Sequence, residues 1–384
     1  MHLIWATEDF IIAGRPYPGF PLVLHETLES AAEVNEFLRH YLTRGRIGST
    51  RSWPNTGRAL YDYFGFLEAN GLDWTDVDRG EEKALVAAYR DYCLQDMKLS
   101  RNTVRQRLHY VCAFYDFALK QGWVERVPYG MEERTVSREG KGFLAHVNAS
   151  GNRQAVRDVM PRVHKSLPKF LSKEQVKALV TVTENPHHRM IIRLALQTGL
   201  RVDELATFPL ACVFNPDARH GSGRNVKVVL NPYDGTGIRT KGSKEREIWI
   251  SRRFMAELYR YSVLLRGELA SKSGTPQKTI FLTQDGLPYA NHGKHIEVMV
   301  RDNAKKVGIR SHPHMLRHTY ATHTLVGLQR NRAANNVEPL VFLQRQLGHA
   351  SISTTMIYLH LVNELVDDAV LSYDDELNDW LEAA

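Results

Sequence analysis

Residues 198–205, in the second half of the chain, read Thr-Gly-Leu-Arg-Val-Asp-Glu-Leu. An apolar helical pattern precedes it and is expected to end at Gly199. Arg201 then enters a new helical turn, with Glu204 one turn later at i+3. An arginine held in this way can be presented rigidly to a phosphate. The same spacing also fits an ordinary Arg–Glu pair on the surface.

A second stretch, residues 312–318, reads His-Pro-His-Met-Leu-Arg-His. Pro313 favours the first turn of a helix, so a helix is predicted to begin here. His314 and Arg317 then share one face near the positive end of the helix dipole, which favours a bound anion. His314 and His318 have the i,i+4 spacing of metal ligands. The sequence lacks the Glu of H-E-x-x-H and a matched set of cysteines, so we expect no metal.

A third stretch, residues 347–358, reads Leu-Gly-His-Ala-Ser-Ile-Ser-Thr-Thr-Met-Ile-Tyr. Ser351 or Ser353 can cap a helix that bears Tyr358 one to two turns later. Taken alone, a tyrosine at this position is most simply a core residue with its hydroxyl at the surface.

Together and in this order, the three stretches resemble the tyrosine recombinase (phage integrase) family. The family pattern has an Arg in T-G-x-R-x-x-E-L, then H-x-L-R-H, then L-G-H with a Tyr nine residues after the His, and all three parts occur within roughly residues 170–360. The resemblance implies an enzyme that cleaves and rejoins DNA through a 3′-phosphotyrosyl intermediate and a Holliday junction, without a cofactor, a metal or ATP. The implied catalytic residues are Arg201, His314, Arg317, His349 and Tyr358, with Glu204 beside them.

The resemblance also implies a catalytic lysine on a β-hairpin turn. Apolar or alternating runs at 226–230 and 247–250 predict two strands, and a tight turn is expected at 241–244. Lys241 and Lys244 both fit. The family pattern G-K-G-x-K-E-R places the lysine before the Gly and favours Lys241, although Thr240 replaces the first Gly. Lys244 is then expected to bind DNA.

The chemistry of phosphodiester cleavage accounts for these residue types. Attack on phosphorus adds negative charge, so the transition state requires fixed cations and hydrogen-bond donors. Arg201, Arg317 and His349 are expected to bind the phosphate, and Tyr358 is expected to attack it. Lys241 is expected to protonate the leaving oxygen, and His314 to accept a proton or bind the phosphate. Glu204 is expected to orient the histidines.

The first third of the chain has helical patterns between residues 30 and 122 that resemble the family's core-binding domain. The last of these helices is expected to begin after Ser100 and to end at Gly122. Arg101 and Arg105 lie on its polar side, which is either a solvated face or a DNA phosphate contact.

The expected fold is mainly α with a small β-sheet, in which a helical core-binding domain and a mixed α/β catalytic domain form a clamp around DNA. We expect an arm at 1–28, the helical domain at 29–135 and a basic linker at 136–168, with a short helix around Arg153–Met160. The catalytic domain follows at 169–384. It is expected to open with a capping box at residues 172–175 and to have helices over residues 252–269 and 289–307. It contains a polar insertion near 329–338 and an acidic helical tail from about 361.

The charge distribution suits a polyanionic partner. The formal net charge is +7, yet residues 361–384 hold eight acids and no Lys or Arg, so the first 360 residues carry 50 basic against 35 acidic side chains. Mean hydropathy is −0.36, and the sequence has no apolar run of 18 residues and no signal-peptide pattern. Three cysteines without a pairing pattern fit a reducing cytoplasm, and we expect association with the nucleoid.

The resemblance implies double-stranded DNA as partner, with a dimer on each site, a homo-tetramer in the synapse, accessory DNA-bending or directionality proteins, and no membrane. We expect the acidic tail to dock on a neighbouring protomer, with docking on its own catalytic domain as the alternative. Three alternatives stay open: a type IB topoisomerase with a similar catalytic set, a non-catalytic DNA-binding protein, and a histidine-rich metalloprotein.

Overall fold

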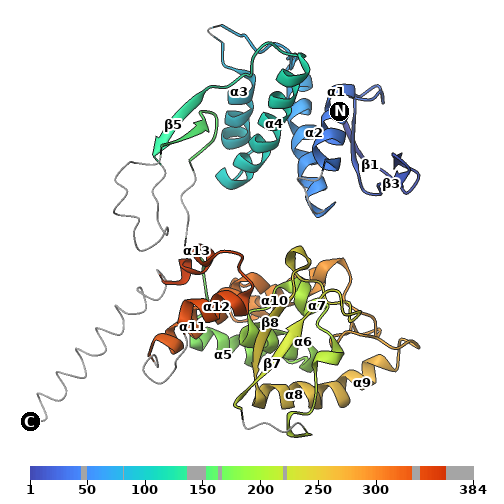
Figure 1. Ribbon diagram of the computed structural model, residues 1–384, viewed down its shortest axis with the longest axis vertical. Helices are drawn as coiled ribbons and strands as arrows, with labels where there is room; N and C mark the ends of the chain where they lie inside the picture. The colour runs from blue at the N-terminus through green and yellow to red at the C-terminus, as the bar shows by residue number, and fades with distance from the viewer. Residues whose placement is uncertain are drawn as a thin grey trace, which may run out of the picture. The chain divides into compact units, whose positions relative to one another are not determined.

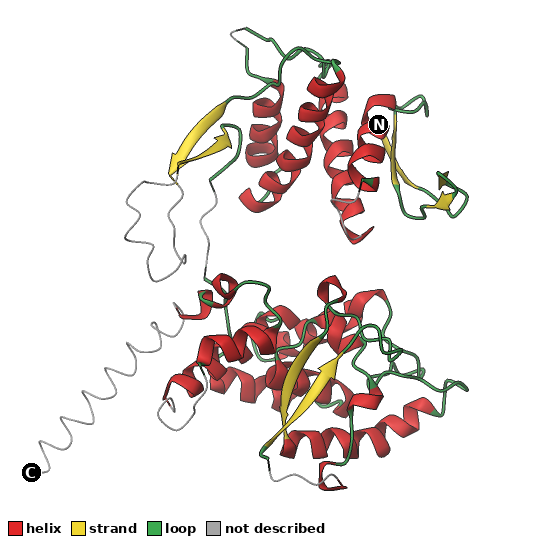
Figure 2. Ribbon diagram, in the orientation of Figure 1, coloured by secondary structure: helices red, strands yellow, loops and turns green. Residues whose placement is uncertain are grey.

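The computed structural model describes residues 1–44, 50–80, 82–135, 153–162, 167–218, 223–330 and 338–359. The chain divides into two compact units, Met1–Lys165 and Ser166–Ala384 (Figure 1). Helices dominate both units, and the strands form two-stranded antiparallel sheets (Figure 2). The prediction of a mainly helical protein with little sheet is therefore confirmed. No described helix is long and apolar enough to cross a membrane.

The first unit is built on four helices, which are α1 (Ala32–Thr43), α2 (Trp53–Ala69), α3 (Leu85–Asp91) and α4 (Arg101–Gln121). As predicted, Ser100 caps α4 by accepting a hydrogen bond from the Thr103 amide, and Gly122 ends it at φ 73°. The apolar faces meet in a core rich in aromatic rings, where Phe114 makes edge contacts with Phe37 and Phe64.

The segment expected to be an N-terminal arm forms two small antiparallel sheets. Strand β1 (His2–Trp5) pairs with β4 (Pro21–Leu24), and β2 (Ile11–Ile12) pairs with β3 (Arg15–Pro16). Phe20 and Val23 are fully buried in the core of the helices. The segment is thus packed onto the first unit.

A two-stranded hairpin follows the helices of this unit in the sequence. Strand β5 (Met131–Thr135) pairs with β6 (Arg153–Arg157), so the prediction of a short helix around 153–160 was wrong. Strand β5, the partner of β6, lies about twenty residues earlier in the sequence. Arg157 of β6 also forms an ion pair with Asp116 of α4. These non-local contacts override the helical pattern of the local sequence. The structure assigns residues 153–162 to the first unit rather than to a separate segment.

The second unit surrounds one hairpin with helices. Strand β7 (Asn225–Leu230) pairs with β8 (Arg246–Ser251) in the predicted region. The helices are α5 (Lys173–Val182), α6 (Pro186–Thr198), α7 (Val202–Ala206), α8 (Arg252–Val263), α9 (Leu265–Ala270), α10 (Lys294–Lys306), α11 (Pro313–Arg330), α12 (Pro339–Leu347) and α13 (Ile352–Thr355). Short turns of helix complete the two units, at Thr50–Ser52 (η1), Tyr92–Asp96 (η2), Leu210–Cys212 (η3), Pro216–Ala218 (η4), Lys241–Ser243 (η5) and Asn291–Gly293 (η6).

Local sequence signals predicted some of these boundaries and missed others. The capping box of Ser172 and Gln175 opens α5 as expected. The helix predicted over 252–269 is two helices, because the backbone turns aside at Leu264 (ψ −75°). The helix predicted from Tyr289 begins only after Gly293, which has the left-handed backbone (φ 79°).

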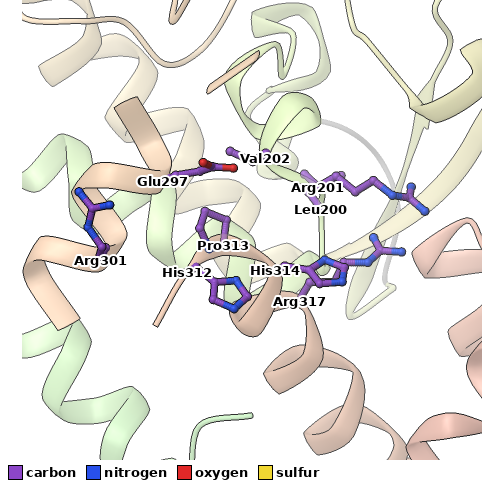
Figure 3. Close-up of a pocket in the computed structure, with 9 residues that line it drawn as sticks. All are labelled: Leu200, Arg201, Val202, Glu297, Arg301, His312, Pro313, His314 and Arg317. Atoms are coloured by element: carbon purple, nitrogen blue, oxygen red, sulfur yellow. The ribbon is translucent and has the colours of Figure 1, made fainter. Parts of the chain in front are cut away.

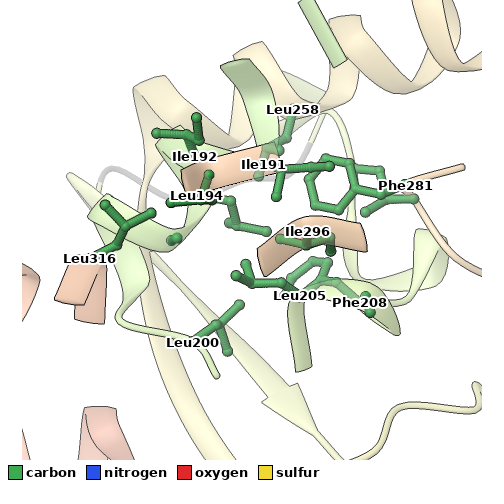
Figure 4. Packing of buried hydrophobic residues seen from close by; sticks show 14 of the residues in the cluster. Ile191, Ile192, Leu194, Leu200, Leu205, Phe208, Leu258, Phe281, Ile296 and Leu316 are labelled. Carbon is green, nitrogen blue, oxygen red and sulfur yellow. The ribbon is translucent and has the colours of Figure 1, made fainter. Parts of the chain in front are cut away.

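Two apolar clusters fix the parts of the second unit that bear the three motifs. The larger cluster packs α6 against α7, α8, α10 and the hairpin, with Ile191, Leu205 and Leu258 among its members (Figure 4). A smaller cluster lies between α11 and α12, and Tyr358 is one of its buried members. Burial of these side chains sets the relative positions of the three motifs.

Candidate active site

Arg201 lies at the junction of α6 and α7. The junction needs a glycine, because Gly199 has φ 65° and a Cβ there would come within 2.6 Å of the Tyr320 ring. The Arg201 amide donates to Oε2 of Glu204 at 2.7 Å, which caps α7. The Arg201 guanidinium donates to the other oxygen of Glu204 and to the carbonyl of Gly348. This arginine is therefore fixed at its backbone and at its side chain.

Glu204 joins two arginines. It is 1% exposed and accepts a hydrogen bond from Arg246 of β8 at 2.6 Å in addition to those from Arg201. Arg246 also donates to the carbonyl of Gln346, which ties β8 to α12, and burial lowers its pKa. Glu204 thus binds arginines where we expected it to orient histidines. The motifs do not single out Arg246 as a site residue, although it is the Arg of the lysine-turn pattern.

Arg317 of α11 is almost completely buried, with 1% of its surface exposed. Its two terminal nitrogens donate to the carbonyls of Gly199 and Leu347, each at 2.6 Å. Burial, followed by repulsion from Arg201, lowers its pKa to about 9, so the guanidinium remains charged at neutral pH. Arg317 consequently links the ends of α6 and α12 and carries a fixed positive charge.

Arg201, His314 and Arg317 line one pocket of about 420 Å³, together with Leu200, Val202, Glu297, Arg301, His312 and Pro313. In Figure 3 the guanidinium groups of Arg201 and Arg317 and the ring of His314 lie together, away from Arg301 and His312. Desolvation and the charge of Arg317 lower the pKa of His314. The pocket presents two permanent cations beside a neutral imidazole, a set that suits a phosphate.

Tyr358 is 1% exposed, and its hydroxyl forms a hydrogen bond with Nδ1 of His318 at 2.9 Å. Its ring stacks on that of His349 with centroids 6.4 Å apart. Burial raises the pKa of Tyr358, while the charges of Arg317 and Arg201 oppose this shift. The sequence indicates His318 only as a possible metal ligand, so its contact with Tyr358 is new.

His349 and His318 are both neutral at physiological pH. Burial and the nearby arginine charges lower the pKa of His349 to about 3, and burial with repulsion from His314 lowers that of His318 to about 4. Nδ1 of His349 lies 2.9 Å from the hydroxyl of Thr355, which is completely buried. Thr355 therefore orients this ring, and no sequence signal indicates it.

The two candidate lysines lie in the loop between β7 and β8, Lys241 in η5 and Lys244 directly after it. Both side chains are exposed, and Gly242 has the positive φ (72°) that the turn requires. Charge repulsion from Lys241 is the smallest of the causes that lower the pKa of His314. Lys241 is not among the residues that line the pocket.

The predicted DNA-binding arginines belong to the first unit. Arg101 and Arg105 are exposed on α4, and they donate to the carbonyls of Arg162 and Pro161. Residues 331–337 of the predicted insertion and the acidic tail from 360 onward lie outside the described residues. Within the described part of the chain, no group of three or more His, Cys, Asp or Glu could hold a metal ion.

Comparison with known proteins gives consistent matches. The model of the phage integrase family matches residues 169–364. The chain is 25% identical to tyrosine recombinase XerC of Bacillus subtilis, over 90% of this chain and 97% of that protein. It is 26% identical to transposase A of transposon Tn554 from Staphylococcus aureus, over 97% and 96%. The crystal structure of XerH bound to palindromic difH in a post-cleavage complex matches with a TM-score of 0.54 and 15% identity, over 91% of this chain and 92% of that one.

Proposed function

This chain belongs to the phage integrase family of tyrosine recombinases, which break and rejoin DNA, and we propose that Tyr358 is its nucleophile. One observation carries this proposal. The Tyr358 hydroxyl is held by a neutral histidine, in the field of Arg201 and Arg317, which line a pocket of about 420 Å³. Fixed cations next to a tyrosine hydroxyl are what nucleophilic attack on a phosphodiester requires.

The proposed step forms a bond between Tyr358 Oη and phosphorus and breaks the bond from phosphorus to the 5′ oxygen. The phenol proton passes to the pair of neutral histidines on α11, His314 and His318. His318 is hydrogen-bonded to the hydroxyl, and the ring centroids of the two histidines are 4.4 Å apart. Lys241 supplies a proton to the departing 5′ oxygen. The 3′-phosphotyrosyl link keeps the energy of the broken bond, so a 5′ hydroxyl can reverse the step.

Arg201, Arg317 and His349 are proposed to bind the phosphate as its charge grows. The guanidinium groups are already anchored to backbone carbonyls, so they lose little freedom when the phosphate arrives. If the Thr355 hydroxyl donates to Nδ1 of His349, the opposite ring nitrogen carries the proton and can donate to a phosphate oxygen. Neutral His349 then acts as a donor without adding charge.

We further propose that the substrate is a specific site in double-stranded DNA, clamped between the two units inside the cell. Dimers on each site would pair into a tetramer through a Holliday junction, with accessory proteins and with the acidic tail docked on a neighbouring protomer. The XerH structure was solved with its difH site, which supports a DNA duplex as substrate. A type IB topoisomerase activity would instead relax supercoiled plasmid that lacks any recombination site.

The nucleophile is tested with Tyr358→Phe. This change removes one oxygen and leaves the ring in its apolar cluster, so we expect DNA binding to persist while covalent attachment is lost. The measurement is a protease-sensitive, SDS-stable DNA adduct on a duplex that contains the recombination site. Tyr233→Phe, at a tyrosine that is 78% exposed, is the matched control and should form the adduct normally. An adduct formed by Tyr358→Phe would disprove the assignment.

A further inference from the structure

The loop that carries Lys241 is fastened at both of its ends to one short helix, α7. Before the lysine, Nε and Nη2 of Arg239 each lie 2.9 Å from Oδ1 of Asp203. After the lysine, Arg246 binds Glu204 at 2.6 Å. Asp203 and Glu204 are consecutive residues of α7, so two adjacent acids hold two arginines on either side of the lysine turn.

The attachment before the lysine also includes the backbone. The amide of Arg239 donates to the hydroxyl of Thr207 at 3.0 Å, and that hydroxyl donates to the carbonyl of Asp203 at 2.7 Å. Thr207 is 6% exposed, so water competes little for these bonds. A single residue, Thr240, separates this fixed point from Lys241.

The turn itself is closed by further hydrogen bonds. The hydroxyl of Thr240 donates to the carbonyl of Lys244 at 2.7 Å, and the amide of Ser243 donates to the carbonyl of Thr240 at 3.1 Å. The side chain of Lys241 is exposed, yet its backbone is held against α7, the helix that Arg201 caps. The geometry therefore places the lysine and the phosphate-binding arginine on one rigid frame.

We propose that Arg239 and Asp203 are positioning residues that hold Lys241 where it can protonate the leaving 5′ oxygen. The proposal rests on the proposed role of Lys241. His292 from η6 also faces Asp203, with Nδ1 at 3.3 Å from Oδ1, so the acid joins three elements. A displaced lysine slows the breaking of the bond from phosphorus to the 5′ oxygen, because that oxygen leaves poorly without a proton. The binding of DNA does not depend on it, and the attack by Tyr358 no longer depends on it once the leaving group needs no proton.

The test uses two versions of a duplex with the recombination site, which is first identified by sequencing DNA trapped on the enzyme. One version has an ordinary scissile phosphodiester, and the other has sulfur in place of the 5′ bridging oxygen. A thiolate leaves without protonation, so the sulfur substrate bypasses the general acid. We expect Arg239→Met and Asp203→Asn to slow single-turnover cleavage of the ordinary duplex by roughly tenfold to a hundredfold. Cleavage of the sulfur duplex should stay close to that of the unchanged enzyme.

Two further variants separate the positioning role from a direct contact between Arg239 and DNA and from general damage to the hairpin. Asp203→Asn leaves the positive charge of Arg239 in place. If Arg239 only contacted a DNA phosphate, this variant would therefore show no defect. Lys227→Met breaks an ion pair with Glu247 on the same hairpin, away from the turn, and should cleave both duplexes normally. Equal slowing of both duplexes by Arg239→Met, or normal cleavage by Asp203→Asn, would overturn the proposal.

The same experiment distinguishes failure of the positioning role from failure of the general acid. Lys241→Ala should lose about 10²- to 10⁴-fold on the ordinary duplex and recover on the sulfur duplex. If Lys241→Ala recovers and Arg239→Met does not, the lysine assignment stands and the positioning role is rejected. If Lys241→Ala does not recover, the general-acid assignment fails and the positioning role fails with it.

Discussion

The two units of this recombinase bury different kinds of side chain. Among the described residues of the first unit, Thr56 is the buried residue of polar, non-aromatic type, and the core is a cluster of apolar side chains and aromatic rings. The second unit buries Glu204, Arg266, Arg317 and Gln346 as well as several threonines. Burial of a charge costs free energy unless it is paired and hydrogen-bonded, so this difference needs a reason.

The reason lies in what each unit has to hold still. Apolar packing is sufficient to hold the helices of the first unit, where tyrosines such as Tyr63 and Tyr115 satisfy each other's hydroxyls at 2.7 Å. In the proposed site, the second unit has to fix two guanidinium groups in the orientation that a phosphate requires. A buried carboxylate and backbone carbonyls provide that orientation, and the apolar cores around them supply the stability that the buried charges lack.

The largest expected effect comes from removing the buried carboxylate. Glu204→Ala leaves Arg201 and Arg246 facing each other without their shared partner, and loss of one partner of a buried ion pair typically costs about 3–5 kcal/mol. We expect the second unit of this variant to unfold at a lower urea concentration, with its free energy of unfolding reduced by that amount. In the first unit, Tyr63→Phe removes one buried hydroxyl and should cost only about 1 kcal/mol.

Glu204→Gln is the control for that experiment, since it keeps the shape of the side chain and one oxygen for the Arg201 amide. It should be less damaging than Glu204→Ala. Equal costs for Glu204→Ala and Tyr63→Phe would mean that the charge network contributes no more than an ordinary hydrogen bond, and the contrast between the units would collapse.

An intermediate effect is expected from the surface of the first unit. If Arg101 and Arg105 contact phosphates, replacing both with Gln should weaken binding about equally on all DNA sequences. The slope of log affinity against log salt should flatten by about one to two. Binding titrations at several salt concentrations measure this slope. Replacement of Arg79 and Arg126, which are ion-paired with acids in the same unit, is the control and should leave the slope unchanged. An unchanged slope for the first pair would remove α4 from the DNA interface.

The smallest expected effect is a dependence of stability on pH in the second unit. The folded-state pKa values of His318 (about 4) and His349 (about 3) lie below the usual 6.5, so the unfolded chain binds protons first as the pH falls. Their contribution to stability is complete above pH 6.5 and decreases as the pH falls toward 4 and 3, by at most about 2 kcal/mol per histidine between pH 7 and pH 5. His318→Gln cannot titrate and should lose less over that interval in denaturation experiments. An identical loss in the variant would show that His318 is not held neutral.

Local signals in the sequence predicted much of this molecule. Ser100 and Gly122 marked the ends of α4, and the fold brings the three motifs into contact, since Arg201 and Arg317 donate to the carbonyls of Gly348 and Leu347. The contacts that hold those residues were not predictable in the same way. Arg239 and Asp203 lie 36 positions apart, and His318 and Tyr358 lie 40 apart, so their contacts leave no periodic pattern. The helix expected near Arg153 failed for the same reason, because its partner strand is distant in sequence.

The carbonyls of Gly199 and Gly348 affect the charge that an incoming phosphate would meet. They lie where α6 and α12 end, the negative pole of each helix dipole, and they accept bonds from Arg317 and Arg201. The partial negative charges at these helix ends thus neutralise part of the arginine charge. They repel an incoming phosphate less than the full negative charges of further carboxylates would. Any side chain at Gly348 would place its Cβ 2.7 Å from Arg246. A side chain at either glycine is therefore expected to disturb the site while every proposed catalytic residue is still present.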